Sequence, residues 1–357
     1  MSDSCQQEED YFDLLPDPIL LLVFDKVLDA KSLCRCLLVS KRFASLIPQL
    51  DSISIKIGTP RKKSDGALRK LRTGSSNNLV NTLICQFIAK PLQFLQHLAM
   101  MKSDSTSENG DLNYVHWMTK YLKNFSEVRF LQLELPSRGS EIGGKDTPFL
   151  KWTAEFGKEL QRCVILQANS FEKRENTCNS TKIDEEEFHQ NQSVLLSNDD
   201  LKTRIIWIIT CVVTASARHS LLKKLVTDCP ELRNAVITDS SKQWKLSMKE
   251  DQIRELRNEM NSSSCSASQM SQRTCVPDLV MRLYYVRELE LACSGYAMKG
   301  ATLVAIRSAS LAEERDGDSF LKGCLGGREG GELLAEAARE ITRRTDKTVY
   351  KVEMSSF

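Results

Sequence analysis

Residues Leu14 to Ile47 read LLPDPILLLVFDKVLDAKSLCRCLLVSKRFASLI, and this stretch says most about the fold. Of its 34 residues, 21 are apolar, about 62%, compared with 41% for the whole protein. The spacing predicts three short helices: one capped by Asp17 with Pro18 at its first position, one capped by Asp29, and one over Val39–Ile47.

These predicted helices are apolar on nearly every side. The first helix has one apolar face, and Leu21, Leu22 and Leu38 lie off the expected faces of the helices. Helices of this kind must be buried on more than one side. Because a segment shorter than about 40 residues rarely encloses a core of its own, the segment is expected to need a protein partner. The first helical face consists of Ile19, Leu20, Val23, Phe24 and Val27.

The same stretch resembles the F-box, a motif that docks on a Skp-type adaptor and, through it, on a cullin–RING ubiquitin ligase. Ser40 and Phe43 stand where Cys and Trp are more usual, and both keep the approximate size. The alternative is an ordinary helical hairpin in a larger core. The matching positions are Leu15-Pro16, Ile19-Leu20, Val23-Phe24, Leu28, Ser32-Leu33, Val39-Ser40-Lys41-Arg42-Phe43 and Leu46.

The resemblance implies an adaptor-binding role for part of this segment, here expected over residues 11–49 after a disordered stretch at 1–10. Truncation of Leu20 or Phe24 is expected to weaken adaptor binding. The residues expected to bind the adaptor are Leu15, Pro16, Ile19, Leu20, Val23, Phe24, Leu28, Leu33, Val39, Lys41, Arg42 and Phe43.

Bulk composition excludes several functional classes. The 49 basic and 47 acidic residues give a net charge of +2, so no strong field for nucleic acid or membrane binding is expected. The twelve cysteines and four histidines lack metal-site spacing, and no metal or cofactor is expected. The longest apolar run, Ile205–Val213, is shorter than the ~20 residues that span a bilayer. The first residues are polar and acidic, which predicts residence in the nucleus or the cytoplasm.

Residues 50–357 are expected to form one α/β domain. Alternating isoleucines predict a strand at Leu50–Gly58. Helices are then predicted over 111–125, 147–161 and 200–229, each followed by a strand. The fold class is therefore α/β: an N-terminal all-α three-helix F-box, then degenerate leucine-rich-repeat-like helix–strand units with a largely parallel sheet. A single α/β layer without true repeats is the equal alternative.

The interpretation as repeated helix–strand units rests on strands around Leu133, Leu166 and Ile237. It also treats residues 169–199 as a disordered insert between two of these units. Further disordered inserts are expected at 261–275 and 311–331 because they are rich in polar residues or glycine. Residues 78–98 are expected to be helical and 61–72 to form a basic loop or a nuclear-localisation patch. The C-terminal part is predicted to contain a hairpin within Arg287–Arg307, a helix at Glu332–Arg344 and a strand at Thr348–Met354.

A second, more specific resemblance covers most of the chain. These segments look like the plant auxin-up-regulated F-box (AUF) proteins, which implies a part in the auxin response. Tyr284 departs from the expected Trp, and the segment at Arg287-Glu288 also departs. The matching segments are Ile206-Trp207, Ala215-Ser216-Ala217-Arg218-His219, Thr238-Asp239-Ser240, Met281-Arg282-Leu283, Lys299–Arg307 and Glu353–Phe357.

No catalytic constellation is found in the sequence. The glycines of 323–331 lack the preceding strand and following Lys-Ser/Thr of a phosphate-binding loop. Cys211 and Cys229 lack a charged setting that would activate a thiol, and His219 is expected to be a packing histidine. The chain is therefore not expected to be an enzyme.

The expected function is that of a substrate-recognition subunit of an SCF-type cullin–RING ubiquitin ligase. The F-box binds the adaptor, and a protein substrate binds the C-terminal domain at residues that the sequence does not identify. Thr238–Ser240 and Lys299–Arg307 are candidates, with sheet packing as their other possible role. The alternative function is an F-box protein that acts outside the ligase as a scaffold or transcriptional partner.

Overall fold

A computed structural model gives the structure of most of the chain. It describes residues 11–12, 14–57, 121–137, 148–174, 196–262, 276–311, 320–321, 324 and 332–356. The basic stretch at 61–72, the expected helix at 78–98 and nearly all of the one expected at 111–125 lie outside these residues.

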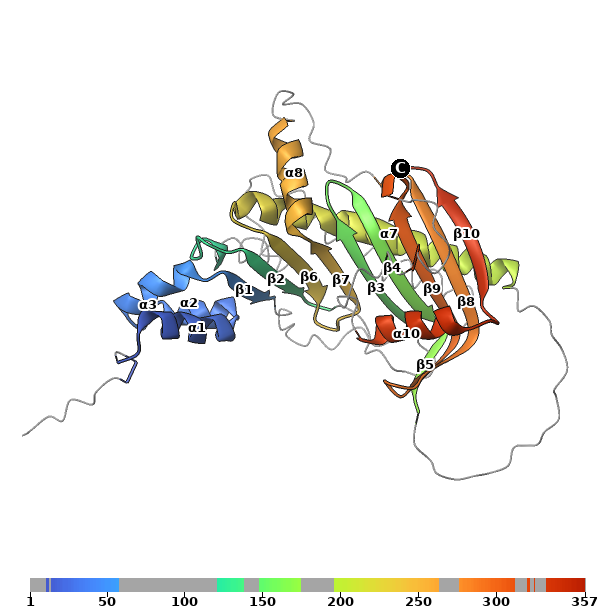
Figure 1. The fold of residues 1–357 in the computed structure, drawn as a ribbon, viewed down its shortest axis with the longest axis horizontal. Coiled ribbons are helices and arrows are strands. Elements are labelled where there is room, and N and C mark those ends of the chain that lie inside the picture. Colours follow the sequence, from blue (N-terminus) through green and yellow to red (C-terminus); the bar gives the residue numbers. More distant parts are fainter. Residues whose placement is uncertain are drawn as a thin grey trace, which may run out of the picture.

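One ten-stranded sheet runs through the molecule (Figure 1). The neighbouring strands follow the order β1-β2-β6-β7-β3-β4-β9-β8-β10, and β5 pairs with β9 beside this path. The strands are β1 (Ser52–Lys56), β2 (Phe130–Leu135), β3 (Phe149–Phe156), β4 (Leu160–Ala168), β5 (Ser170–Lys173), β6 (Asn234–Asp239), β7 (Trp244–Met248), β8 (Leu279–Leu291), β9 (Tyr296–Ser308) and β10 (Thr348–Met354).

The expectation of a largely parallel sheet is wrong. Among the described strands only β1–β2, β2–β6 and β3–β7 are parallel pairs, and the six other pairings are antiparallel. The assumed repeat also fails, because β2 and β4, which carry Leu133 and Leu166, are separated by β6, β7 and β3. The domain is a mixed α/β layer.

Two helices cover opposite faces of the sheet (Figure 1). The long helix α7 (Asn198–Asp228) begins after Ser197, whose hydroxyl accepts a hydrogen bond from the Asp200 amide at 3.1 Å, and it ends just before Pro230. The amphipathic helix α10 (Glu332–Arg343) lies on the other face. A third helix, α8 (Glu250–Ser262), packs beside α7.

The core has two parts, one on each face of the sheet. The larger part lies on the α7 side and includes Cys163 and Ile165 of β4. The smaller part lies between the sheet and α10 and includes Val164 and Leu166 of the same strand. The alternation along β4 thus places successive side chains in different cores, as expected for a central strand that is covered on both faces.

The segment expected to be a helix at 147–161 is a strand with a turn and the start of the next strand. Trp152, Phe156 and Leu160 have the i, i+4 spacing of a helix, but Trp152, Ala154 and Phe156 also alternate. The structure uses the alternation: these three side chains are buried on the α7 face, and β3 pairs with β4 and β7. Pairing on both sides outweighs the local helical spacing.

Parts of the expected inserts are structured. Ser170–Lys173 forms β5, and residues 196–199 lead into α7. Helix α8 continues through Ser262. In the third insert, Phe320, Leu321 and Cys324 are buried against the sheet. Residues 175–195, 263–275 and the rest of 312–331 lie outside the described part.

The N-terminal helices join the edge of the sheet and share its larger core. They are α1 (Asp17–Val27), α2 (Ala30–Cys36) and α3 (Lys41–Leu46), followed by the short 3-10 helix η1 (Ile47–Gln49). Leu20 of α1 and Leu33 of α2 belong to the same buried cluster as Ile53 of β1. Figure 1 shows these helices at the β1 end of the molecule, far from β10.

Candidate functional site: the apolar surface of the N-terminal helices

Side-chain capping marks the start of two of the three N-terminal helices, α2 and α3. Pro16 is the residue before α1, so the expectation that Asp17 caps this helix is wrong. The Asp29 carboxylate accepts from the Ser32 amide at 2.9 Å and starts α2, as predicted. The Ser40 hydroxyl accepts from the Phe43 amide at 3.1 Å and starts α3.

Arg42 fastens the first helix to the third. Its Nε donates to the Asp17 carboxylate at 2.8 Å, and its Nη1 donates to the Phe12 carbonyl at 3.1 Å. Its Nη2 donates to the Leu15 carbonyl. The Phe43 ring lies edge-on to Phe24, with ring centroids 5.0 Å apart. Arg42 and Phe43 of α3 therefore hold this helix against α1 and the residues that precede it.

Three of the twelve expected adaptor-binding residues are buried inside this chain. Leu20 and Leu33 are fully buried, and Phe24 is 5% exposed. They contact the larger core, so a partner protein has no direct access to them. This corrects the expectation that Leu20 and Phe24 are binding anchors: they shape the surface from below.

The exposed apolar side chains of the described part concentrate on the N-terminal helices and the short segments beside them. Ten of the fifteen large ones lie between Tyr11 and Val39. Leu38 is 87% exposed, Val39 69% and Leu22 59%. We call these ten residues the N-terminal apolar surface. They are Tyr11, Phe12, Leu14, Ile19, Leu22, Val23, Val27, Leu28, Leu38 and Val39.

Some residues of this surface were missed by the motif comparison. It identified Ile19, Val23, Leu28 and Val39. It did not select six others, although the positions of Leu22 and Leu38 off the helical faces were a signal for them. The other expected positions lie at the margin, where Pro16 and Lys41 are exposed and Leu15 is half-buried.

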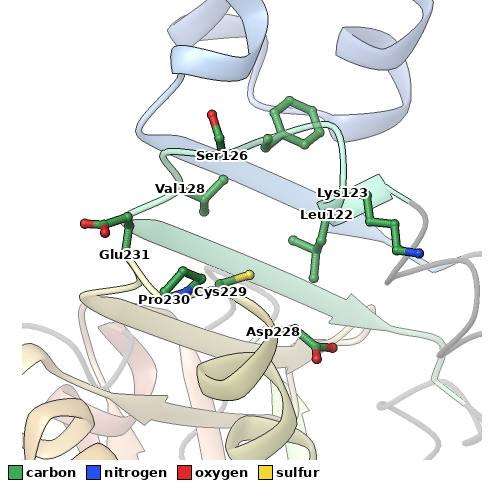
Figure 2. Close-up of a pocket in the computed structure, with 9 residues that line it drawn as sticks. Leu122, Lys123, Ser126, Val128, Asp228, Cys229, Pro230 and Glu231 are labelled. Carbon is green, nitrogen blue, oxygen red and sulfur yellow. The ribbon is translucent and has the colours of Figure 1, made fainter.

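A pocket lies between the segment that precedes β2 and the end of α7 (Figure 2). Its volume is about 350 Å³, and none of the expected site residues lines it. In Figure 2 the Leu122 side chain points toward Asp228, the last residue of α7. The walls are mainly apolar, with charged groups from both sides. The lining residues are Leu122, Lys123, Phe125, Ser126, Val128, Asp228, Cys229, Pro230 and Glu231.

The sulfur and imidazole groups considered as catalysts are in environments that keep them unreactive. Burial raises the pKa of the Cys229 thiol in this pocket to about 11 and that of Cys211 to about 12. Both thiols are therefore protonated at neutral pH. Burial lowers the pKa of His219 to about 3, and its ring stacks on Phe156 at 4.4 Å. His219 is thus a neutral packing group.

Segments identified by the AUF resemblance contribute to packing. The Arg218 guanidinium lies 3.9 Å from the centroid of the Trp244 ring, which stacks on Trp152. The Asp239 carboxylate accepts from the Gln243 and Trp244 amides at 2.8 and 3.2 Å and so organises the β6–β7 turn. Lys299–Arg307 lies in β9, mostly buried between β4 and β8.

Metal ligands and membrane-spanning helices are the last features to consider in the described residues. No cluster of three or more His, Cys, Asp or Glu side chains there could hold a metal ion. One helix, α7, is long and apolar enough to span a membrane by length and composition. However, 56% of its most apolar stretch is buried inside the molecule, which is the position of a core helix.

The chain is similar in sequence to known F-box proteins. The F-box-like family matches residues 12–51, which contain all three N-terminal helices. F-box protein At5g46170 of Arabidopsis thaliana is 37% identical over 98% of this chain and 94% of its own length. F-box protein AUF2 is 31% identical over 87% and 90%, and F-box protein AUF1 is 26% identical over 98% and 100%, both from the same plant. No solved structure matches.

The similarity to the first relative runs through both parts of the molecule, the N-terminal helices and the sheet. F-box proteins as a class serve as adaptor subunits of ubiquitin ligases and are not themselves enzymes. The chain belongs to the plant F-box proteins of the AUF type.

Proposed function

We propose that this chain is the substrate-recognition subunit of an SCF-type cullin–RING ubiquitin ligase. The observation that carries the proposal is the N-terminal apolar surface, which lies on helices that match the F-box-like family. The partner on this surface is a Skp-type adaptor, and the cullin and RING subunits join through it. The α/β domain holds the protein substrate.

The concentration of apolar groups supports a docking role. Ten exposed large apolar side chains lie within about 30 residues. Exposed apolar groups that gather on one surface commonly mark a protein interaction site. A standard protein interface covers about 800 Å² on each partner, which three short helices can offer. Leu38 is the most exposed of the ten, and Leu22 is the most exposed apolar residue on α1, so both are candidates for binding anchors.

The shared core supports a fixed geometry between the two bound proteins. Leu20 and Leu33 of the F-box and Ile53 of β1 belong to one buried cluster. The Ser126 amide also donates to the Pro48 carbonyl at 3.2 Å and links the F-box end to the segment before β2. A substrate held by the sheet domain therefore keeps a constant position relative to the adaptor. Catalysis then arises from proximity of a substrate lysine to the carrier enzyme.

Charge introduced on the N-terminal apolar surface tests the proposal. Leu22→Glu combined with Leu38→Glu should reduce affinity for a Skp-type adaptor at least a hundredfold, because each places a charge in an apolar interface. Leu311→Glu is the matched control, since Leu311 is also an exposed leucine but lies far along the chain from the F-box. The measurement is calorimetric titration of the adaptor into full-length chain, with thermal unfolding recorded for each variant.

Two results would contradict the proposal. The first is unchanged adaptor affinity in the double variant. The second is adaptor binding without co-purification of a cullin, which would favour the alternative role as a scaffold outside the ligase. The expected result is that adaptor and cullin are recovered together with the wild-type chain and with Leu311→Glu, and that both are lost with the double variant.

A further inference from the structure

The two edges of the sheet differ in their protection. At the β1 edge, the Ser54 amide donates to the Leu28 carbonyl at 2.6 Å, and Asp29 forms an isolated bridge with Ser54. The F-box thus closes that edge. At the opposite edge, no described strand pairs with the outer side of β10.

The section of β8 that extends beyond β10 has no described strand on its outer side but does have a side-chain contact there. Strand β10 pairs with β8 only over Leu279–Tyr285, so the rest of β8 has β9 as its only described partner strand. There the Arg344 guanidinium donates to the Glu288 carbonyl at 2.8 Å. This contact occupies a carbonyl of β8 beyond the end of β10. Among the described strands, β8 is the only one that pairs with β10.

Strand β10 is suited to pair with a further strand. It reads TVYKVEM, without proline or glycine, and its pairing with β8 continues without a register shift from Thr348 to Met354. Edge strands are commonly protected by proline, by bulges or by charged side chains, especially lysine. The two charges on β10, Lys351 and Glu353, lie 3.2 Å apart and offset each other.

Apolar side chains at this edge are only partly covered. Tyr350, Val352 and Met354 are half-buried, whereas Met281 and Leu283 of the neighbouring β8, on the same face, are buried. The start of α7 adds two further half-buried leucines to this face and projects slightly past β10 in Figure 1. The Leu196 amide donates to the Tyr350 hydroxyl at 3.2 Å and fixes this helix start to the strand. The two leucines are Leu196 and Leu201.

We propose that the outer edge of β10 binds an extended segment of a partner protein as an additional strand. The inference rests on the proposed function, in which this partner is the ubiquitination substrate. Main-chain hydrogen bonds to β10 would supply affinity, and side chains at alternate positions would supply selectivity. One face of the added strand covers the half-buried groups Tyr350, Val352 and Leu201.

The chemistry of β10 defines the segment that fits. It has about five to seven residues, matching an ordinary strand, and no proline in its interior. Apolar residues alternate toward the α7 side. On the other face, an acidic residue lies opposite Lys351 and a basic residue opposite Glu353, since opposite charges across strands are favourable.

A second copy of this chain is a poorer occupant of the same edge. Antiparallel pairing of two β10 strands in one continuous sheet would keep both α7 helices on the same face. Because α7 projects past β10, the helix of each copy would meet that of the other at the junction (Figure 1). An extended peptide has no such helix and can lie along the start of α7.

The experiment uses a display library of random 12-residue peptides selected on the full-length chain. We expect enriched peptides with alternating apolar residues and with an acidic and a basic residue two positions apart. The double variant Lys351→Glu, Glu353→Lys should weaken binding of a selected peptide about three- to tenfold and favour the peptide with its two charges exchanged. Arg339→Glu, on the exposed face of α10, is the control that changes charge elsewhere.

Backbone chemistry separates strand addition from ordinary side-chain binding. Methylating one amide nitrogen that faces β10 should abolish binding of the selected peptide, while methylating the next amide along the peptide should be tolerated. Hydrogen exchange of the β10 amides that face away from β8 should slow when the peptide binds.

Several outcomes would overturn the inference: no alternating pattern among selected peptides, insensitivity to the charge reversal, or protection in the unbound chain of the β10 amides that face away from β8. A dimer that depends on Lys351 and Glu353 would assign the edge to a second copy and would equally overturn it. Adaptor titration distinguishes the two proposals. If the adaptor binds and no peptide does, this inference alone fails, whereas peptide binding without adaptor binding contradicts the proposed function.

Discussion

Leu20 shows how burial separates a folding role from a binding role. Its side chain is fully buried in the larger core, so Leu20→Ala removes packing and leaves a cavity. The expected loss of unfolding free energy is about 2–5 kcal/mol. Chemical denaturation of the full-length chain measures it, and Leu22→Ala, on the exposed side of the same helix, is the matched control. Equal stability of the two variants would show that Leu20 does not anchor the core.

His219 should make stability depend on pH. Burial holds its folded pKa at about 3, below the unfolded value of 6.5. Between these values the unfolded chain binds a proton that the folded chain does not, so stability is full above pH 6.5 and falls as the pH decreases toward 3. The slope from this group is about 1.4 kcal/mol per pH unit.

The variant His219→Phe isolates this contribution. Phenylalanine can still stack on Phe156 but does not titrate. Between pH 6.5 and 5, where carboxylates contribute little, the stability of the variant should change by about 2 kcal/mol less than that of the wild type. Unfolding by urea at several pH values provides the measurement. Parallel curves for the two proteins would mean that His219 is accessible to protons in the folded state.

At the scale of elements, the β8–β9 hairpin depends on two glycines with different surroundings. Gly295 has φ +72° and nothing within 4 Å of an added Cβ, whereas Gly300 has φ +61° and a Cβ there would meet the Asn169 amide at 2.6 Å. Gly295→Ala should therefore cost about 1–2 kcal/mol from backbone strain alone. Gly300→Ala should cost more, because the Asn169 side chain must also move. Thermal unfolding of both variants tests the order, and equal losses would contradict it.

The sequence predicted elements well where one periodicity dominated. Helix α7, stopped before Pro230, the hairpin at Gly295 and the final strand were all predicted from local signals and are confirmed. The segment around Trp152 satisfied two periodicities, and only the pairing of β3 with β4 and β7 decides between them. Strand β7 was not predicted, although Trp244, Leu246 and Met248 alternate with polar residues.

The predicted order of strands in the sheet was wrong for a different reason. Strands β3 and β4 form a hairpin that is inserted between β2 and β6 in the sequence, and β7 separates that hairpin from β6 in the sheet. Spacing along the chain cannot show this arrangement, because the register between distant strands arises from packing. For the same reason the F-box motif identified the segment that we propose binds the adaptor, whereas the burial of Leu20, Phe24 and Leu33 became visible only in the structure.

At the scale of the whole molecule, the shared core means that the F-box and the sheet should fold together. The sequence favoured two separable parts divided near Leu50. In the structure, removal of residues 1–49 would uncover Leu50, Ile53 and Ile55, which are now nearly fully buried. Exposing three such side chains costs roughly 5–8 kcal/mol, which is comparable to the total stability of an ordinary domain.

A fragment of residues 50–357 should therefore aggregate or unfold well below the melting temperature of the full-length chain. The matched control is the full-length Leu22→Glu, Leu38→Glu variant, which changes the proposed adaptor-binding surface but leaves the buried residues Leu20 and Leu33 in place. This variant should retain the wild-type melting temperature and a single unfolding transition. Circular dichroism during heating compares the three proteins. A fragment with the melting temperature of the full-length chain would show that the core divides at β1. The proposed fixed geometry between adaptor and substrate would then lose its physical basis.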